Sequence, residues 1–437
     1  MIGGYAFANN QNIEKIVLPT TVTTLNDRAF RDTSASTVVL NEGLTNISYQ
    51  AFRNALNVKS VVIPSTVTTI SKEAFQHSGI KEIVIPANVT EIEYGGLRDM
   101  KELEKVTIEG NVDIPIYAFR ACTNLKTVIL KGENVTFGGG SRGMIFTNKE
   151  DGDGSAITVT VANEVVKARL LAADTAAKDY GGYTIICEHT ADADGVYTDG
   201  EGNQYAFVND GADMSTVIAG GADKVYLSDG NFVVPNTTSG KTVDIIGNGE
   251  TVIDITTVPT YAGLPGATIT FENVIIKSDP QGAGYNRGFA HTNKVTYNNC
   301  VINGTLGLNT DTEFNNCTFN ISGDFYSLWT WGAENVTLTG CTFNSDGKAL
   351  LLYGGANTKL TLNDCTFNDK GGLSDKKAAI EIGNDYNTSY ELIVNNTTVN
   401  GYEINDKGIN TGTTLWGNKN SMGTDKLNVV VDGVDVY

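Results

Sequence analysis

The sequence is poor in several residue types that common functional sites need. It has three histidines in 437 residues, which argues against a metal site built from several histidines. Lys and Arg total 31 against 50 Asp and Glu, a formal charge of -19. That balance argues against nucleic acid and anionic membrane surfaces as partners, because both need a positive field. No apolar run is long enough to span a membrane, and no signal-peptide pattern opens the chain.

Proline is also scarce, whereas glycine is abundant. The chain has 8 prolines and 48 glycines, with many Asn and Thr residues, a mixture typical of short strands joined by tight turns. Hydrophobic residues make up 41% and charged residues 19%, so the chain is not a disordered acidic tail. Its length favours two or three domains.

The first part of the chain repeats every 22 or 23 residues. One series is a small–aromatic pair, with one Gly-Leu exception: Ala6-Phe7, Ala29-Phe30, Ala51-Phe52, Ala74-Phe75, Gly96-Leu97 and Ala118-Phe119. A second series keeps the same period with β-branched segments: 16–18, 38–40, 61–63, 83–85, 106–108 and 128–130. One unit cannot bury these residues alone, but stacked units can, so we predict a solenoid with a ladder of Phe side chains.

This pattern resembles the BspA-like leucine-rich repeat of bacterial surface proteins. The clearest match is Ile63-Pro64-Ser65-Thr66-Val67-Thr68-Thr69-Ile70 followed by Ala74-Phe75, and Cys122 occupies the small buried position of the family. The resemblance covers about residues 2–131 and departs from the family at Leu97 and at 111–115. It implies a bacterial cell-surface or secreted protein. The chain opens in mid-repeat, so we expect a preceding portion, with any signal peptide, to be missing.

Residues 132–190 are predicted to close the array, completing a domain of residues 1–190. We expect a strand at 157–161, a helix from about 163 to 180 with Asn163 as its N-cap, and a final strand at 184–187. Residues 191–204 are acidic and rich in glycine, which indicates a linker or entry segment.

A different repeat occupies residues 205–437. Each copy contains an Asn, Asp or Gly followed by Cys or, once, by Thr: Asn299-Cys300, Asn316-Cys317, Gly340-Cys341, Asp364-Cys365 and Asn396-Thr397. Alternating strands precede the copies, which predicts a parallel β-helix. A second column of asparagines is expected to hydrogen-bond from coil to coil: Asn303, Asn320, Asn344, Asn368 and Asn400.

This half resembles the right-handed parallel β-helix of the pectin-lyase-like superfamily, a similarity of fold and not of activity. The predicted fold class is therefore mainly β: a leucine-rich repeat array with a small α/β cap, then a right-handed parallel β-helix. The four β-helix cysteines share one phase and cannot face one another, so we predict free thiols rather than disulfides, with Cys122 and Cys187 free as well.

Two segments of the β-helix are candidates for catalysis. Asp311 lies in Asn309-Thr310-Asp311, which matches the first motif of polygalacturonases, but no second carboxylate motif accompanies it, and glycoside hydrolysis needs two carboxylates. The loop 279–291 carries Tyr285, Arg287 and His291, which could transfer protons or bind an anion. A solvated loop is the favoured interpretation of both segments.

Aromatic residues recur in a further strand series, and its register has two solutions. Alignment on the glycines stacks Trp331, Tyr353, Ile382 and Trp416 in the core. Alignment on Leu328, Leu350 and Ile380 turns Trp329 and Trp331 outwards, as a platform for sugar rings. We favour the core for Tyr353 and Trp416.

In the repeat array, one residue per strand is predicted to lie on the exposed face: Val17, Val39, Val62, Val84, Thr107 and Ile129. Simple β-propensity explains this stripe, and so does a surface that binds a partner. Both interpretations stay open.

No cofactor is predicted. The acidic pairs Asp151/Asp153, Asp192/Asp194 and Asp199/Glu201 could hold Ca²⁺, but they lack a full calcium-loop pattern, and solvated loops are favoured.

The leading functional hypothesis is an adhesin that binds host proteins or glycans over its solenoid surfaces. The alternative is a polysaccharide lyase or glycosidase on the β-helix, with the leucine-rich repeats as a targeting module. A third interpretation is a structural spacer.

Overall fold

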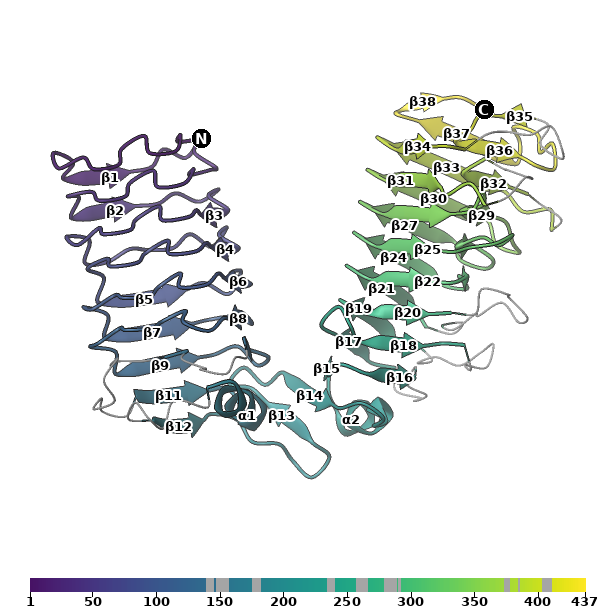
Figure 1. Ribbon diagram of the computed structural model, residues 1–437. Coiled ribbons are helices and arrows are strands. Elements are labelled where there is room, and N and C mark those ends of the chain that lie inside the picture. Colours follow the sequence, from purple (N-terminus) through teal and green to yellow (C-terminus); the bar gives the residue numbers. More distant parts are fainter. Residues whose placement is uncertain are drawn as a thin grey trace. The chain divides into compact units, whose positions relative to one another are not determined.

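The computed structural model describes residues 1–138, 145–146, 157–174, 182–233, 240–256, 266–278, 289, 292–372, 378–383, 386–402 and 411–437. The chain divides into two compact units, Met1–Thr190 and Ala191–Tyr437. Each is a stack of short, mostly parallel strands (Figure 1). The described residues include two helices, α1 (Glu164–Ala173) and α2 (Met214–Gly220). The fold is therefore mainly β and built from solenoid repeats, as predicted.

Unit 1 carries short strands on two sides of its stack, with no strand on the first side at residues 61–63. The first side has β1 (Lys15–Val17), β2 (Thr37–Val39), β5 (Glu82–Ile85), β7 (Lys105–Ile108), β9 (Thr127–Leu130), β11 (Ile157–Val161) and β12 (Tyr183–Cys187). The second side has β3 (Asn46–Ile47), β4 (Thr69–Ile70), β6 (Glu91–Ile92), β8 (Asp113–Ile114) and β10 (Thr136–Phe137). All pairings within these sheets are parallel.

The predicted phenylalanine ladder runs through the core of unit 1. Successive rings stack from Phe7 to Phe30, Phe52 and Phe75, with centroids 5.3 to 5.6 Å apart. Leu97 is fully buried in the next rung, so it fills the slot without a ring. These contacts confirm that like residues are stacked on like residues.

The cap of unit 1 contains a helix where one was predicted, described from Glu164 to Ala173. Asn163 is the N-cap of α1, and its side chain accepts hydrogen bonds from the amides of Val165 and Val166. The helix ends at Ala173, with Asp174 as its C-cap, and residues 175–180 of the predicted helix lie outside the described residues. The buried carboxylate of Asp174 accepts hydrogen bonds from the Ile145 amide and the Tyr183 hydroxyl.

Unit 2 is a parallel β-helix whose coils pass through three sheets. Sheet 1 comprises β13 (Val196–Thr198), β14 (Gln204–Val208), β15 (Lys224–Leu227), β17 (Thr242–Ile246), β19 (Thr268–Glu272), β21 (Lys294–Asn298), β24 (Asp311–Asn315), β27 (Asn335–Thr339), β30 (Thr358–Asn363), β33 (Tyr390–Asn395), β37 (Leu427–Val431) and β38 (Val434–Asp435). Sheet 2 comprises β16 (Asn231–Val233), β18 (Val252–Asp254), β20 (Ile275–Lys277), β22 (Val301–Asn303), β25 (Thr318–Asn320), β28 (Thr342–Ser345), β31 (Thr366–Asp369) and β34 (Thr398–Asn400). Sheet 3 comprises β23 (Leu306–Gly307), β26 (Leu328–Trp329), β29 (Leu350–Leu352), β32 (Ile380–Ile382), β36 (Trp416–Asn418) and β35 (Thr411–Gly412).

The repeated sequence frame is explained by the sharp bend between sheets 1 and 2. The bend residue has a left-handed backbone in six successive coils, a conformation that Asn, Asp and Gly adopt most easily. It is Asn273, Asn299, Asn316, Gly340, Asp364 or Asn396, with φ between 46 and 65°. The next residue then points inwards, which places four cysteines in one buried column: Cys300, Cys317, Cys341 and Cys365. All six thiols of the chain are free.

The predicted asparagine ladder lies along sheet 2. Each side-chain amide donates to the preceding one: Asn320 to Asn303, Asn344 to Asn320, Asn368 to Asn344 and Asn400 to Asn368, at 2.9 to 3.2 Å. The ladder pairs polar groups that the coils bring together, so successive coils are held in one register.

Candidate functional site

Sheet 3 of unit 2 has an inner and an outer face, and its pairing decides which aromatic residues lie outside. Leu328 pairs with Leu350, which pairs with Ile380, which pairs with Trp416. These four side chains are in the core. Because side chains alternate along a strand, the residues that follow them point outwards. The alignment on the leucines is therefore the correct register.

The prediction of a core position is confirmed for Trp416, which is 5% exposed, and is wrong for Tyr353. β29 ends at Leu352, whose side chain is in the core, so alternation turns Tyr353 outwards. Tyr353 is half-buried, and its ring lies 5.9 Å from Trp329 and 6.4 Å from Trp331.

Four rings gather on this outer face, and we call them the aromatic cluster: Trp329, Trp331, Tyr353 and Tyr386. Trp329 meets Trp331 edge to face at 5.1 Å, and Tyr386 lies 5.7 Å from both Trp331 and Tyr353. Trp329 Nε1 donates to the carbonyl of Tyr353 at 2.8 Å, which fixes the indole. Tyr386 is 50% exposed, so part of the cluster faces solvent.

Beside the cluster lies a charged residue that the sequence analysis missed. Glu381 points to the outer face, opposite Leu351 in the register, and is fully buried. The Tyr326 hydroxyl donates to Glu381 Oε2, and Lys419 Nζ lies 3.6 Å from Oε1. Oε1 itself accepts no hydrogen bond. The alternation in Ile380-Glu381-Ile382 was enough to predict that Glu381 lies on the outer face. Its burial could not be predicted, because it depends on Tyr326 and Lys419, which come from other coils.

A side-chain amide, that of Asn309, also lies near the cluster. Asn309 Nδ2 is buried and donates no hydrogen bond. A Cβ atom on Gly332, which follows Trp331, would lie 3.1 Å from Asn309 Oδ1, so Asn309 lies close to the cluster. Aromatic rings with a few convergent polar groups are typical of small-molecule sites, and buried polar atoms without partners can take a hydrogen bond from a ligand.

One catalytic candidate, Asp311, does not join this face. Asp311 lies on β24 of sheet 1 and not in a loop. Its Oδ1 and Oδ2 accept hydrogen bonds from the backbone amide and side-chain amide of Asn335, both at 2.8 Å. This carboxylate therefore joins two coils. Tyr285, Arg287 and His291 lie outside the described residues.

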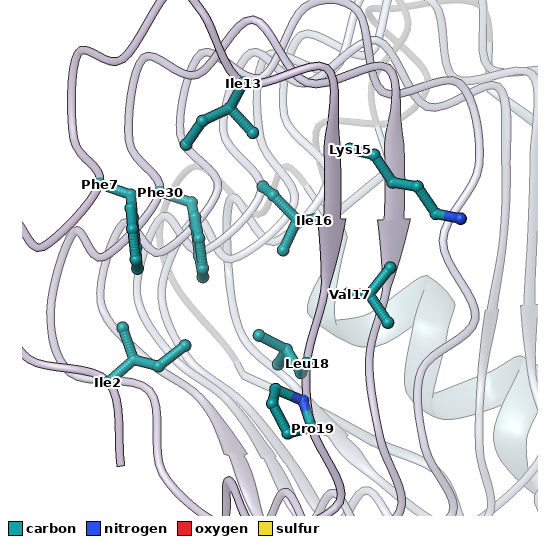
Figure 2. A pocket seen from close by; sticks show the side chains of 9 residues that line it. All are labelled: Ile2, Phe7, Ile13, Lys15, Ile16, Val17, Leu18, Pro19 and Phe30. Atoms are coloured by element: carbon teal, nitrogen blue, oxygen red, sulfur yellow. The ribbon is translucent and has the colours of Figure 1, made fainter.

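The valine stripe of unit 1 is the second candidate surface, and it comprises Val17, Val39, Val62 and Val84. These side chains are 54, 45, 82 and 51% exposed, respectively. Figure 2 shows the alternation in the first strand, with Ile16 and Leu18 on the side of Phe7 and Phe30, and with Lys15 and Val17 on the opposite side.

Two predicted members of the stripe are less exposed than expected. Thr107, which pairs with Val84 and Ile129, is only 8% exposed because its small side chain lies between larger neighbours. Ile129 is half-buried. The same column continues through Thr160 to Ile186, which is 50% exposed. Thr160 and Ile186 belong to the strands predicted at 157–161 and 184–187. The alternation of side chains along those strands could have placed both residues in this column.

An apolar pocket opens beside β1 at the first repeat (Figure 2). Its lining consists of Ile2, Phe7, Ile13, Lys15, Ile16, Val17, Leu18, Pro19 and Phe30. Most of these positions correspond to core columns that are covered in later repeats: Phe7 is 41% exposed, whereas Phe30 is 3% exposed. Lys15 is the single charged side chain in the lining, so the pocket offers little polar chemistry.

The acidic pairs within the described residues close turns. Asp192 Oδ1 accepts hydrogen bonds from the amides of Asp194 and Val196, and Asp199 Oδ1 accepts from those of Glu201 and Asn203. Asp151 and Asp153 lie outside the described residues. Where the chain is described, no group of three or more His, Cys, Asp or Glu side chains could hold a metal ion. Neither described helix is long and apolar enough to cross a membrane.

Comparison with known proteins identifies the first repeat type. Residues 1–138 match the family model described as BspA type leucine rich repeat region, in six copies. The match confirms the resemblance inferred for this segment. No curated protein matches the chain.

Two solved structures are similar to parts of the chain. One is the pneumococcal vaccine antigen PcpA, at 23% identity and a TM-score of 0.35, covering 41% of this chain and 42% of the antigen. The chain thus spans less than half of that structure. The other is a leucine-rich repeat protein from Bacteroides ovatus, at 14% identity and a TM-score of 0.29, covering 90% of this chain and 82% of that protein.

Proposed function

We propose that this chain is an adhesin, a bacterial cell-surface or secreted binding protein, and that its β-helix binds glycans through the aromatic cluster. The surface location is supported by the BspA type repeats of residues 1–138. Glycan binding is supported above all by one observation, the aromatic cluster on the outer face of sheet 3.

The chemistry of the cluster suits a sugar. Sugar rings have an apolar face of C–H groups and a rim of hydroxyls, so they stack on Trp and Tyr rings and hydrogen-bond at their edges. Tyr386 is half exposed and Trp331 is half-buried beside it. Two buried polar atoms, Asn309 Nδ2 and Glu381 Oε1, make no hydrogen bond.

The proposal is for binding and not for turnover. Hydrolysis requires two carboxylates at a defined separation across the glycosidic bond. Asp311 lies on sheet 1 with both oxygens bound by Asn335, whereas Glu381 lies on sheet 3.

Alanine at Trp331 or Tyr386 tests this function. We expect glycan binding by the intact chain to weaken roughly twofold to tenfold for each ring removed, because one aromatic contact contributes about 0.5–1.5 kcal/mol. The measurement is binding to an immobilised glycan array followed by titration with the best ligand. Tyr94→Ala is the matched control, since Tyr94 is a 40% exposed ring of unit 1. A blank array with the wild-type chain would refute the proposal.

A second candidate function is binding of a protein partner by unit 1. It is favoured by the valine stripe, in which Val62 is 82% exposed between the buried residues Val61 and Ile63. Four exposed apolar side chains recur once per repeat along this side of unit 1, and exposed apolar patches mark protein interfaces.

Lysine at Val39 and Val62 tests the second function. A charge in the patch core should weaken binding to a responsive host-matrix protein by tenfold or more, about 1.4 kcal/mol, as measured by surface plasmon resonance. Leu56→Lys provides the control, because Leu56 is 62% exposed but lies off the stripe. An equal loss of affinity in the valine-stripe variant and in Leu56→Lys would show that the stripe is not the binding surface.

A further inference from the structure

We infer that the aromatic cluster selects neutral sugars over uronic acids, with Glu381 as the specificity-determining residue. This inference rests on the glycan-binding function proposed above and names the class of its ligand. It is carried by the pairing of charges around the cluster.

The two lysines described on this side of sheet 3 are both neutralised. Lys419 Nζ lies 3.6 Å from Glu381 Oε1. Lys348 forms an ion pair with Asp324 and lies over the Tyr326 ring, 5.4 Å from its centroid. A uronate carboxylate is recognised by a cation that is free to form charge-assisted hydrogen bonds. Neither lysine meets this condition.

Glu381 sets the charge next to the rings. A Cβ atom placed on Gly383 would lie 3.2 Å from Tyr353 Cδ2 and 3.8 Å from Lys419 Cδ. The stem of Lys419 therefore approaches the cluster at Tyr353, while its ammonium group faces Glu381. Without the Glu381 charge, Lys419 would be an unpaired cation beside Tyr353, available to a sugar carboxylate.

The charge of the surrounding chain acts in the same direction. The whole chain carries a formal charge of -19. A polyuronate approaching this protein meets a negative field, which lowers its association rate and its affinity. A neutral oligosaccharide is unaffected by this field and keeps its stacking contacts.

Two buried polar atoms that make no hydrogen bond match the hydroxyls of a neutral sugar. Glu381 Oε1 is an acceptor, and Asn309 Nδ2 is a donor. A sugar hydroxyl can donate to the first and accept from the second. A carboxylate can satisfy only the donor, and it would be repelled by Glu381.

The substitution Glu381→Gln tests the inference on the full chain. Glutamine has nearly the same shape and can still accept the Tyr326 hydrogen bond, but it removes the charge that pairs Lys419. The matched control is Glu313→Gln, which makes the same change in charge at an exposed ion pair on sheet 1, where Lys294 Nζ lies 2.7 Å from Glu313 Oε1. Melting temperatures of both variants establish that they are folded.

The ligands are a neutral β-glucan hexasaccharide and an oligogalacturonate of the same length, each titrated by calorimetry. For the wild-type chain we expect the oligogalacturonate to bind roughly tenfold more weakly than the glucan, or not at all. Glu381→Gln should raise the oligogalacturonate affinity about twofold to fivefold, the range of one partly exposed ion pair. Added salt should reverse the gain. Glu313→Gln should leave the binding of both ligands within about twofold of the wild-type level. For Glu381→Gln the readout is the ratio of the oligogalacturonate affinity to the glucan affinity, because Glu381 Oε1 also offers an acceptor to a sugar hydroxyl.

Two other outcomes would overturn the inference, and they are distinguishable. Tighter binding of the oligogalacturonate than of the glucan by the wild-type chain would overturn the selectivity while leaving the glycan-binding function in place. Binding of neither ligand, together with a blank glycan array, would overturn the glycan-binding function and this inference with it.

Discussion

At the scale of single residues, position in the stack decides what a side chain contributes. Phe52 and Phe7 occupy the same slot of the repeat, yet Phe52 is 2% exposed and Phe7 is 41% exposed. Phe52 stacks on two rings, Phe30 and Phe75, each at 5.6 Å. Phe7 stacks on Phe30, at 5.3 Å. The same Phe→Ala substitution at the two sites therefore measures how much of the stabilisation depends on burial, because the residue type is unchanged.

Phe52→Ala should destabilise unit 1 by about 3–5 kcal/mol, because it removes a buried ring and leaves a cavity between two others. Phe7→Ala should cost about 1–2 kcal/mol, since much of its ring is already in contact with water. Urea unfolding followed by circular dichroism measures both. Equal shifts for the two variants would contradict a ladder that stabilises by burial.

At the scale of strands and helices, the structure shows what can be predicted from the sequence and what cannot. The phenylalanine, cysteine and asparagine columns were predictable because each recurs at one position of the repeat, and the stacking of like residues follows from a fixed coil geometry. In unit 1 the period is nearly constant, so the alternation around Val62 placed its side chain correctly on the exposed face.

Sheet 3 was harder because its coils differ in length. Successive cysteines of the column are 17, 24 and 24 residues apart. The strands of sheet 3 could therefore be aligned equally well on Gly332 and Gly354 or on Leu328 and Leu350. One residue of slip reverses the face of a strand. The hydrogen-bonded pairing of β26 with β29 resolved it.

Long-range contacts account for the remaining errors. Tyr386 lies outside any strand, and no period marks it. The C-cap of α1, Asp174, accepts hydrogen bonds from Ile145 and Tyr183, residues that are distant in sequence or beyond the helix. Such partners are visible only once the chain has folded.

At the scale of the whole molecule, each unit has a core of its own. One cluster of buried residues runs from Ile16 to Leu170 and the other from Val196 to Val429. Neither cluster needs a side chain of the other, so each solenoid can gain its stability from contacts between its own neighbouring repeats. A single free energy of unfolding would therefore not describe this chain.

The distribution of tryptophan makes this independence measurable. All three tryptophans, Trp329, Trp331 and Trp416, belong to the β-helix. Tryptophan fluorescence thus reports unit 2 alone, whereas circular dichroism reports both units. We expect Phe52→Ala to lower the urea midpoint of one circular dichroism transition and to leave the fluorescence midpoint unchanged. If the fluorescence midpoint moved with it, the two cores would unfold as one cooperative unit, and the division of stability at residue 190 would be wrong.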